Sequence, residues 1–380
     1  MGKLIHNIFL LCAVFAGSLL LQDPLRTAFA AEVKGNWKAE WEKTVKAAKG
    51  EGEVVVFAWI TSGLRNAVAE FRKVYPEIKL IYVPGTGSQL GPRLLAERRA
   101  GKYLADLYIG GTTTPVEVLI PAKALDPIRP ALILPEVANE SLWFGKRFYF
   151  ADPNGEYVLL FDGTVSSSFI AYNTKLVKRE EFQSTWDLLH PKWKGKIVAH
   201  DPRRSGGAGG PIRYLYFSSH LGPKFVHRLF NEMDVTFGPD ARQMMDWLAT
   251  GKYPLYLFPG GSELDTAKAQ GLPVDEITHI TREGAAMHAG AGAVGLLNRA
   301  PHPNAAKLFT NWFLSRDGQI AYQRHEQRNS LRTDIPKDNL TDKTVVPREG
   351  MDYIFSALPE YRDLNPIRKL ITEALPASKK

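Results

Sequence analysis

Short apolar runs alternate with helix-length amphipathic segments along the first third of the chain. The runs at 53–58, 78–83 and 104–109 have the length and β-branched content of buried strands. Between them, 64–71 and 90–95 carry apolar residues at helical spacing. Strands joined by helix-length connections favour a parallel sheet. The pattern therefore predicts an α/β fold built from successive strand-loop-helix units.

The middle of the chain repeats this pattern. Further strands are predicted at 169–172, 196–199 and 256–258, with helices at 212–221 and around 264–267. The loop Asp201–Gly210 between two of these elements is the most glycine-dense in the chain. We expect a second α/β unit, each unit having a mainly parallel sheet, and a cleft where the two units face each other.

The predicted strands run into loops rich in glycine, serine and threonine, and each loop opens a helix. Helix N-termini offer free N–H groups and a partial positive charge, which suit anionic ligand groups. One such loop is typical of an ordinary N-cap, but several in register indicate a ligand site. The candidate ligand-binding residues are Trp59, Thr61, Ser62, Gly87, Ser88, Thr112, Thr113, Ser167, Arg203, Arg204, Ser205, Gly261 and Ser262.

Three of these predictions carry alternatives or conditions. Trp59 could stack on a ligand or pack in the core. Arg203 and Arg204 could hold a carboxylate or phosphate, or form a solvated pair. Asp201 in the same loop would repel an anion unless it pairs with an arginine or points away.

The tetrad Thr114–Glu117 is expected to form a capping box with proline at the first helical position.

The N-terminus has the features of an export signal. Lys3 precedes an almost wholly apolar run, Ile8–Leu21, and Ala28–Ala30 matches the small-x-small cleavage pattern. The run is shorter than the roughly 20 residues of a membrane-spanning helix. We predict a signal peptide at 1–30, cleaved after Ala30, and a periplasmic mature chain. The alternative is a membrane anchor.

Composition excludes several classes of protein. The chain has 380 residues, of which 44% are hydrophobic and 23% charged, as in ordinary globular proteins. This length favours two domains or two lobes, because single cores stop growing at about 250–300 residues. The net charge of +8 is scattered, which argues against nucleic-acid binding. The single cysteine, Cys12, cannot form an internal disulfide.

Recognisable catalytic motifs are absent from the sequence. It contains no G-x-S-x-G elbow, H-E-x-x-H pair or P-loop. Gly290–Gly295 fits the dinucleotide fingerprint by letter, but Pro301 falls where a long helix is required, so a glycine-rich strand at a domain crossing is preferred. His279 and His288 are isolated. We therefore predict no catalytic residues, no metal ligands and no cofactor.

Several segments resemble one family. Thr185–Leu189 followed by Pro191–Ile197 resembles a hallmark of bacterial ABC-transporter solute-binding proteins of the ferric-iron-binding type. Two later segments, Asn298–Gly318 and Ser330–Asp334, are similar to the same family. In the first of them, Ser315–Gln319 is expected to close a helix. The resemblance runs over nearly the whole chain after residue 30. It implies the type II periplasmic-binding-protein fold, two α/β lobes joined by hinge strands around one ligand.

The resemblance also implies boundaries and partners. Lobe 1 is expected at 31–165 and 290–340, and lobe 2 at 166–289 and 341–380. The chain would cross between lobes near Ser166 and Gly290 and return near residue 340. The implied partners are a small-molecule solute and a membrane ABC permease, and the protein is expected to be a monomer.

The sequence departs from the ferric binders at their iron ligands. Those proteins use a tyrosine pair after the last lobe-2 strand, commonly with a histidine and a glutamate from lobe 1. The corresponding segments here, Pro259–Glu263, Trp59–Ser62 and Gly110–Thr112, lack these side chains. Fe³⁺ prefers hard anionic oxygen ligands. We therefore expect a small polar or anionic solute. The alternatives are a ferric binder with non-tyrosine coordination and a secreted α/β enzyme using the same cleft.

Overall fold

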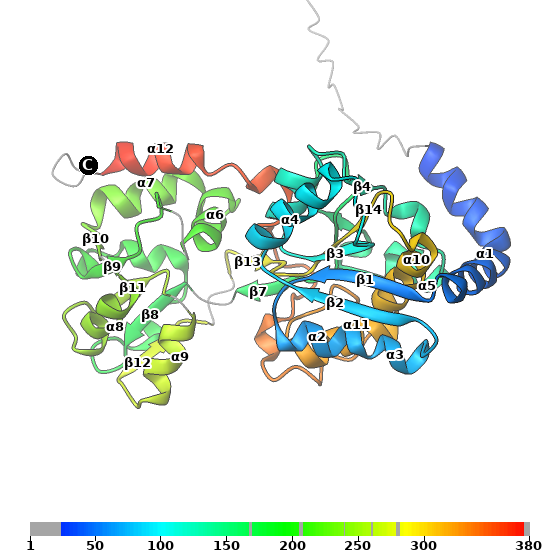
Figure 1. The fold of residues 1–380 in the computed structure, drawn as a ribbon. Coiled ribbons are helices and arrows are strands. Elements are labelled where there is room, and N and C mark those ends of the chain that lie inside the picture. Colours follow the sequence, from blue (N-terminus) through cyan, green and yellow to red (C-terminus); the bar gives the residue numbers. More distant parts are fainter. Residues whose placement is uncertain are drawn as a thin grey trace, which may run out of the picture.

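The chain folds into two α/β lobes that lie side by side (Figure 1). The computed structural model describes residues 24–166, 169–204, 208–238, 240–259, 261–278 and 282–375. In Figure 1 the larger lobe, with the blue and cyan elements, is on the right, and the smaller lobe, mainly green and yellow, is on the left. The predicted two-lobed α/β fold is confirmed.

The sheet of the larger lobe has seven strands in the described part of the chain, in the order β2-β1-β3-β14-β6-β5, with β4 paired to β14. These strands are β1 (Glu53–Ala58), β2 (Lys79–Pro84), β3 (Leu107–Gly110), β4 (Leu125–Asp126), β5 (Tyr149–Phe150), β6 (Leu159–Leu160) and β14 (Ala293–Leu297). β1 pairs in parallel with β2 and β3, but β14 runs antiparallel to β3, β4 and β6. The sheet is mixed rather than mainly parallel because β14 enters it from the opposite end, after the smaller lobe.

Apolar strands and amphipathic helices form the core of this lobe. Val54, Val56 and Phe57 of β1 are buried, as expected for a central strand packed on both faces. The helices of this lobe are α1 (Pro24–Glu51), α2 (Ser62–Ala69), α3 (Phe71–Val74), α4 (Gly87–Arg99), α5 (Pro135–Ala138), α10 (Pro303–Leu314) and α11 (Arg316–Glu326). The short helix η1 (Pro115–Leu119) follows β3.

The smaller lobe has a five-stranded sheet within the described ranges, in the order β10-β9-β11-β8-β12. The strands are β8 (Ile170–Asn173), β9 (Ile197–Ala199), β10 (Thr236–Phe237), β11 (Leu255–Leu257) and β12 (Val274–Glu276). The helices are α6 (Gly209–Phe217), α7 (Gly222–Glu232), α8 (Ala241–Ala249), α9 (Gly261–Ala269) and α12 (Asn365–Ala374). β9 is parallel to β10 and β11, while β8 is antiparallel to β11 and β12.

A small third sheet lies between the lobes. β13 (Ala285–His288) pairs antiparallel with β7 (Thr164–Ser166) and parallel with β15 (Tyr353–Phe355). Figure 1 shows β7 and β13 at the junction of the two lobes. The junction therefore contains three strands, with β13 in the middle, hydrogen-bonded to β7 on one side and to β15 on the other. The lobe boundaries given above stay a prediction.

Two local predictions hold only in part. Pro115 begins η1 as predicted, but the capping box does not form. Thr114 makes no capping hydrogen bond. Its buried side chain bonds to Tyr108, and a Cβ at Gly87 would lie 2.2 Å from its Oγ1, so packing overrides the capping pattern. Ser315 closes α10 as expected, since its N–H donates to the Trp312 carbonyl at 3.2 Å, but residues 316–319 begin α11 instead of ending α10. Ser315 Oγ accepts from Gly318 N and caps the start of α11.

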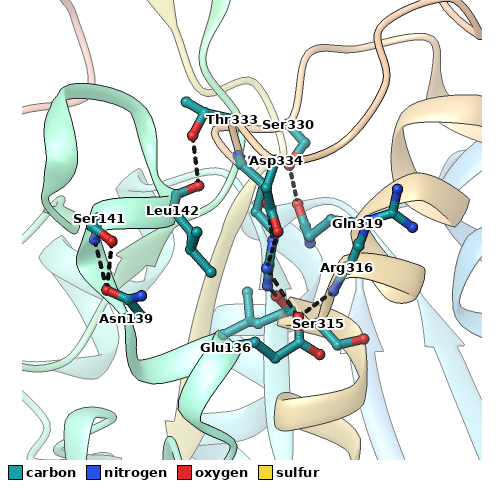
Figure 2. Close-up of polar contacts among 12 residues, drawn as sticks. Glu136, Asn139, Ser141, Leu142, Ser315, Arg316, Gln319, Ser330, Thr333 and Asp334 are labelled. Carbon is teal, nitrogen blue, oxygen red and sulfur yellow. Dashed lines mark hydrogen bonds and ion pairs between the residues drawn. The ribbon is translucent and has the colours of Figure 1, made fainter.

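The segment after α11 is fixed by a buried arginine, in the region shown in Figure 2. Arg332 is fully buried and donates to both carboxylate oxygens of Asp334, at 2.9 and 2.7 Å. It also lies 2.9 Å from a Glu136 carboxylate oxygen and donates to the Leu314 carbonyl. Figure 2 shows Ser330 donating to Gln319 and Thr333 donating to the Leu142 carbonyl. These contacts join residues 136–142, 314–319 and 330–334 into one polar cluster.

Lys337 makes the stability of the fold depend on pH. Burial lowers the pKa of its ammonium group to about 7, although Asp334 and Asp162 oppose the shift. The unfolded chain would bind this proton up to about pH 10. Between about pH 7 and pH 10 the unfolded state therefore holds more protons, so this group makes stability rise with pH.

We expect the free energy of unfolding of the wild type, relative to a Lys337→Gln variant, to increase from pH 7 to pH 9. Urea denaturation of both proteins at each pH measures it. A constant difference across this window would show that the ammonium group is not perturbed.

No helix in the described part of the chain is both long enough and apolar enough to cross a membrane. Residues 1–23 of the predicted signal peptide lie outside the described residues. The cleavage site after Ala30 stays a prediction.

Candidate ligand-binding site

Three loops of the larger lobe lie side by side where β1, β2 and β3 end. Gly85 N donates to the Ala58 carbonyl at 3.0 Å, and Trp59 N donates to the Ile109 carbonyl at 2.9 Å. The register of the parallel strands thus brings together the loops that begin at Trp59, Gly85 and Gly110. This is the edge at which ligands bind in open α/β sheets.

The residues after β1 are largely engaged by the protein itself. The Trp59 side chain is partly buried against the core, and its carbonyl accepts a hydrogen bond from the Tyr82 hydroxyl. Thr61 caps α2 by accepting from Leu64 N at 3.2 Å, and it donates to a Glu326 carboxylate oxygen at 2.9 Å. Ser62 is exposed at the first residue of α2. A ligand contact by these residues stays a prediction.

The second and third loops present hydroxyl groups. A capping box of Thr86 and Gln89 opens α4, which places Gly87 in its first turn against Thr114. Ser88 is exposed, with its Oγ 2.9 Å from Thr86 Oγ1. Thr112 and Thr113 follow β3 and line a pocket described below.

In the smaller lobe, the side chain of Arg203 is largely buried in an ion pair, whereas the side chain of Arg204 is largely exposed. Arg203 donates to Asp201 through Nε at 2.9 Å and Nη2 at 2.8 Å, and its guanidinium lies over the Phe237 ring. The bidentate bond to Asp201 raises the pKa of Arg203. Arg204 has a side chain 83% exposed. Asp201 therefore pairs with an arginine, so its negative charge is compensated within the loop.

The remaining four predicted site residues are Gly261, Ser262, Ser167 and Ser205. Gly261 and Ser262 belong to the first turn of α9, which follows β11. Ser167 and Ser205 lie outside the described residues.

An interlobe pocket of about 270 Å³ adjoins the third loop. Its lining comes from the loop after β3 and η1, from α6, from the end of β13, and from the segment after β15. The lining residues are Thr112, Thr113, Glu117, Arg213, His288, Ala289, Gly290, Ser356, Ala357 and Arg362. Of the predicted site residues, this pocket brings together Thr112 and Thr113.

Two arginines that sequence reasoning missed give the pocket its charge. Arg213 Nε donates to the Tyr361 carbonyl at 2.7 Å, and its Nη1 donates to the Gly209 carbonyl at 2.9 Å. Burial, and then the neighbouring Arg362 and Arg368, lower the pKa of Arg213. Burial also lowers the pKa of Arg362. Arg362 lies 149 residues beyond Arg213, so no local pattern joins them. In the sequence, the sign that Arg213 belongs to the site is its position one turn after the glycine-dense loop.

His288 connects the pocket to a buried ion pair. Burial and the nearby Arg328 lower the pKa of His288 to about 4, so the ring is neutral at pH 7. Arg328 Nη2 lies 3.2 Å from His288 Nδ1. Since a guanidinium only donates, Nδ1 accepts and the ring proton is on Nε2.

Behind this histidine, Asp162 is fully buried and holds three partners. It accepts from Tyr322 Oη at 2.6 Å, from Thr164 Oγ1 at 2.7 Å and from both Nε and Nη2 of Arg328. Burial lowers the pKa of Arg328, but the Asp162 carboxylate outweighs this and raises it. The cluster fixes one end of β7 next to the segment after α11.

Among the described residues, no group of three or more histidine, cysteine, aspartate or glutamate side chains could hold a metal ion.

Two lobes, a junction of three strands and a polar pocket between them define a binding protein for a small solute. The comparison with known families agrees. Residues 58–320 match the family model of bacterial extracellular solute-binding proteins, and the chain belongs to this family. The predicted function class, a solute-binding protein, is confirmed.

Solved structures show the same fold at low identity. A putative extracellular solute-binding protein from Bordetella parapertussis is 15% identical with a TM-score of 0.61, and the match covers 85% of this chain and 97% of that one. The iron- and citrate-bound IdiA (FutA) of Trichodesmium is 16% identical with a TM-score of 0.57, covering 85% and 99%. The periplasmic binding protein AfuA from Actinobacillus pleuropneumoniae, with fructose-6-phosphate bound, is 20% identical with a TM-score of 0.51, covering 85% and 97%.

Proposed function

We propose that the protein is the periplasmic binding component of an ABC importer. It captures a small polar or anionic solute between its lobes and delivers it to a membrane permease. The observation that carries this proposal is the interlobe pocket, which is lined by polar side chains from both lobes and from the junction. A ligand that contacts both lobes stabilises their closed arrangement, and a permease can distinguish closed from open.

Two further observations support the proposal, the first for export and the second for the link to an ABC transporter. Residues 1–30 have the pattern of a cleaved export signal. A structure described as an ABC transporter from Clostridium perfringens shares the fold, with 15% identity and a TM-score of 0.58. The protein acts as a monomer and performs no covalent chemistry on its solute.

The alternatives make different demands on the site. A ferric-iron binder needs several anionic oxygen ligands around one point. The solved relatives include iron-bound HitA from Pseudomonas aeruginosa, so the fold accommodates iron. The pocket of this chain instead carries two arginines, which repel a cation, and its lining includes one carboxylate, Glu117, rather than several anionic ligands around one point. An enzyme would need a nucleophile with an adjacent base, but within the described residues no hydrogen bond joins a hydroxyl group of the lining to His288 or Glu117.

We expect the protein, purified without denaturation, to retain a small solute that native mass spectrometry identifies. Adding that solute to the emptied protein should reduce its radius of gyration in small-angle X-ray scattering, because closure brings the lobes together. Ferric citrate serves as the comparison and should change neither the radius nor the visible absorption spectrum. A radius that stays constant at saturation with the identified solute would contradict closure.

A further inference from the structure

We infer that the interlobe pocket binds an oxyanionic group of the solute, a phosphoryl group or a carboxylate, through Arg213 and Arg362. This inference rests on the proposed function, since it assigns the chemical class of the solute. It also differs from the sequence prediction, which assigned the anion to Arg203 and Arg204 in the loop after β9.

The pocket carries the positive charges of Arg213 and Arg362, and neither guanidinium forms an ion pair within the described residues. Arg213 bonds to backbone carbonyls, which carry no net charge, and the charged groups that act on it are Arg362 and Arg368. Arg362 is influenced by Glu117 and Asp152, but neither forms an ion pair with it within the described residues. Partly buried charges of one sign cost free energy unless a counter-charge is present. A bound anion supplies that charge.

Both arginines also have N–H groups that donate to no acceptor in the described part of the protein. Arg362 Nε and Nη2 are buried and have no hydrogen-bond partner among the described residues. Arg213 directs three donors to carbonyls and so keeps two of its five N–H groups. His288 Nε2 carries a proton, as derived above, and Thr112 adds a hydroxyl group. Buried donors without partners are rare in folded proteins, so their concentration here points to a ligand rich in acceptor oxygens.

The predicted arginines are less suited to this role. Arg203 is committed to Asp201 by two hydrogen bonds, so an anion would have to compete with a carboxylate already in place. The Arg204 side chain is mostly exposed, where an ion pair contributes little. Arg213 and Arg362 are only partly exposed and face a pocket.

The size and origin of the pocket agree with a small solute held by both lobes. Its volume of about 270 Å³ lies near the lower limit of the roughly 300–1,000 Å³ typical of drug-sized ligands. Arg213 comes from α6 of the smaller lobe, Thr112 from the larger lobe, and Arg362 from the segment between β15 and α12. An anion held by all three would link the lobes. Glu117, the acidic residue of the lining, is exposed and could accept from a hydroxyl group of the same solute.

Calorimetry at low ionic strength tests this inference with three probes: inorganic phosphate, glycerol phosphate and malonate. The wild type should bind at least one of them, and the preferred probe distinguishes a phosphoryl group from a carboxylate. Arg362→Gln and Arg213→Gln should each weaken that binding by about ten- to a hundredfold, because each removes charge-assisted hydrogen bonds to the anion. Arg228→Gln, which removes an arginine paired with Glu232 on α7, should bind as the wild type does.

Arg213 also fastens α6 to residues 361 and 362, so loss of binding in its variant could reflect a displaced segment. Arg362→Gln avoids this ambiguity, since two of its guanidinium nitrogens make no bond that could be lost. The inference is overturned if no probe binds the wild type, or if Arg362→Gln binds with unchanged affinity. A neutral solute that closes the lobes would overturn it too, while leaving the importer role intact.

Discussion

Replacing Asp162 with asparagine is expected to lower the free energy of unfolding by about 3–5 kcal/mol, the range seen when one partner of a buried ion pair is removed. Asp162 has no exposed surface, and its carboxylate is the counter-charge of Arg328. Asparagine preserves the shape of the side chain but leaves the guanidinium buried without a negative partner. Urea denaturation followed by circular dichroism measures the loss.

A matched control separates this effect from that of any lost carboxylate. Glu181 pairs with Lys192 at the surface, where both side chains are partly solvated. Glu181→Gln should therefore leave the denaturation midpoint almost unchanged, since exposed pairs contribute little. If Asp162→Asn and Glu181→Gln gave the same small shift, the buried pair would contribute no more than a surface one.

Arg332→Met is expected to lower the free energy of unfolding by about 2–3 kcal/mol, as for a lost hydrogen bond to a charged group in a buried site. Methionine keeps part of the volume of the side chain but none of its donors. The Asp334 and Glu136 side chains are 27% and 42% exposed, so they regain water and soften the loss. The buried Leu314 carbonyl, 3.0 Å from Arg332 Nη1, loses a donor.

Thermal denaturation of Arg332→Met beside Arg228→Met measures this difference. Arg228 is paired with Glu232 on the surface of α7, so its variant should melt close to the wild type. Equal melting temperatures for the two variants would mean that the cluster around residues 330–334 is held by its backbone contacts alone.

The parts of the fold that the sequence predicted are those governed by local physics. β1 was predicted at 53–58 and is found at Glu53–Ala58, because a short β-branched run between turns has few alternatives. Thr114 failed as a capping residue because its backbone is already helical, its hydroxyl bonds to Tyr108, and its side chain packs against α4, almost thirty residues earlier in the chain. Local patterns carry no information about such contacts.

The candidate site divides in the same way. Thr112 and Thr113 could be proposed because they follow a strand directly, and strand ends gather at one edge. Arg213 and Arg362 could not, because they meet only after α6, β13 and the segment after β15 have assembled. The pairing of Arg203 with Asp201 was foreseen as a condition, since the two residues are neighbours in the chain.

The order in which the chain is synthesised has a consequence for when it can fold. β14 lies between β3 and β6 in the large sheet, although it comes about 180 residues after β3 and about 130 residues after β6 in the sequence. In the smaller lobe, α12, the last helix, lies next to α7 (Figure 1) and buries Ile367 and Ile371 in the same core as residues of α7. Neither hydrophobic core is complete until almost the whole polypeptide has been made. We expect a nascent chain of this kind to lack its native packing until late in synthesis, and an unfolded polypeptide is the form that can pass through a narrow translocation channel.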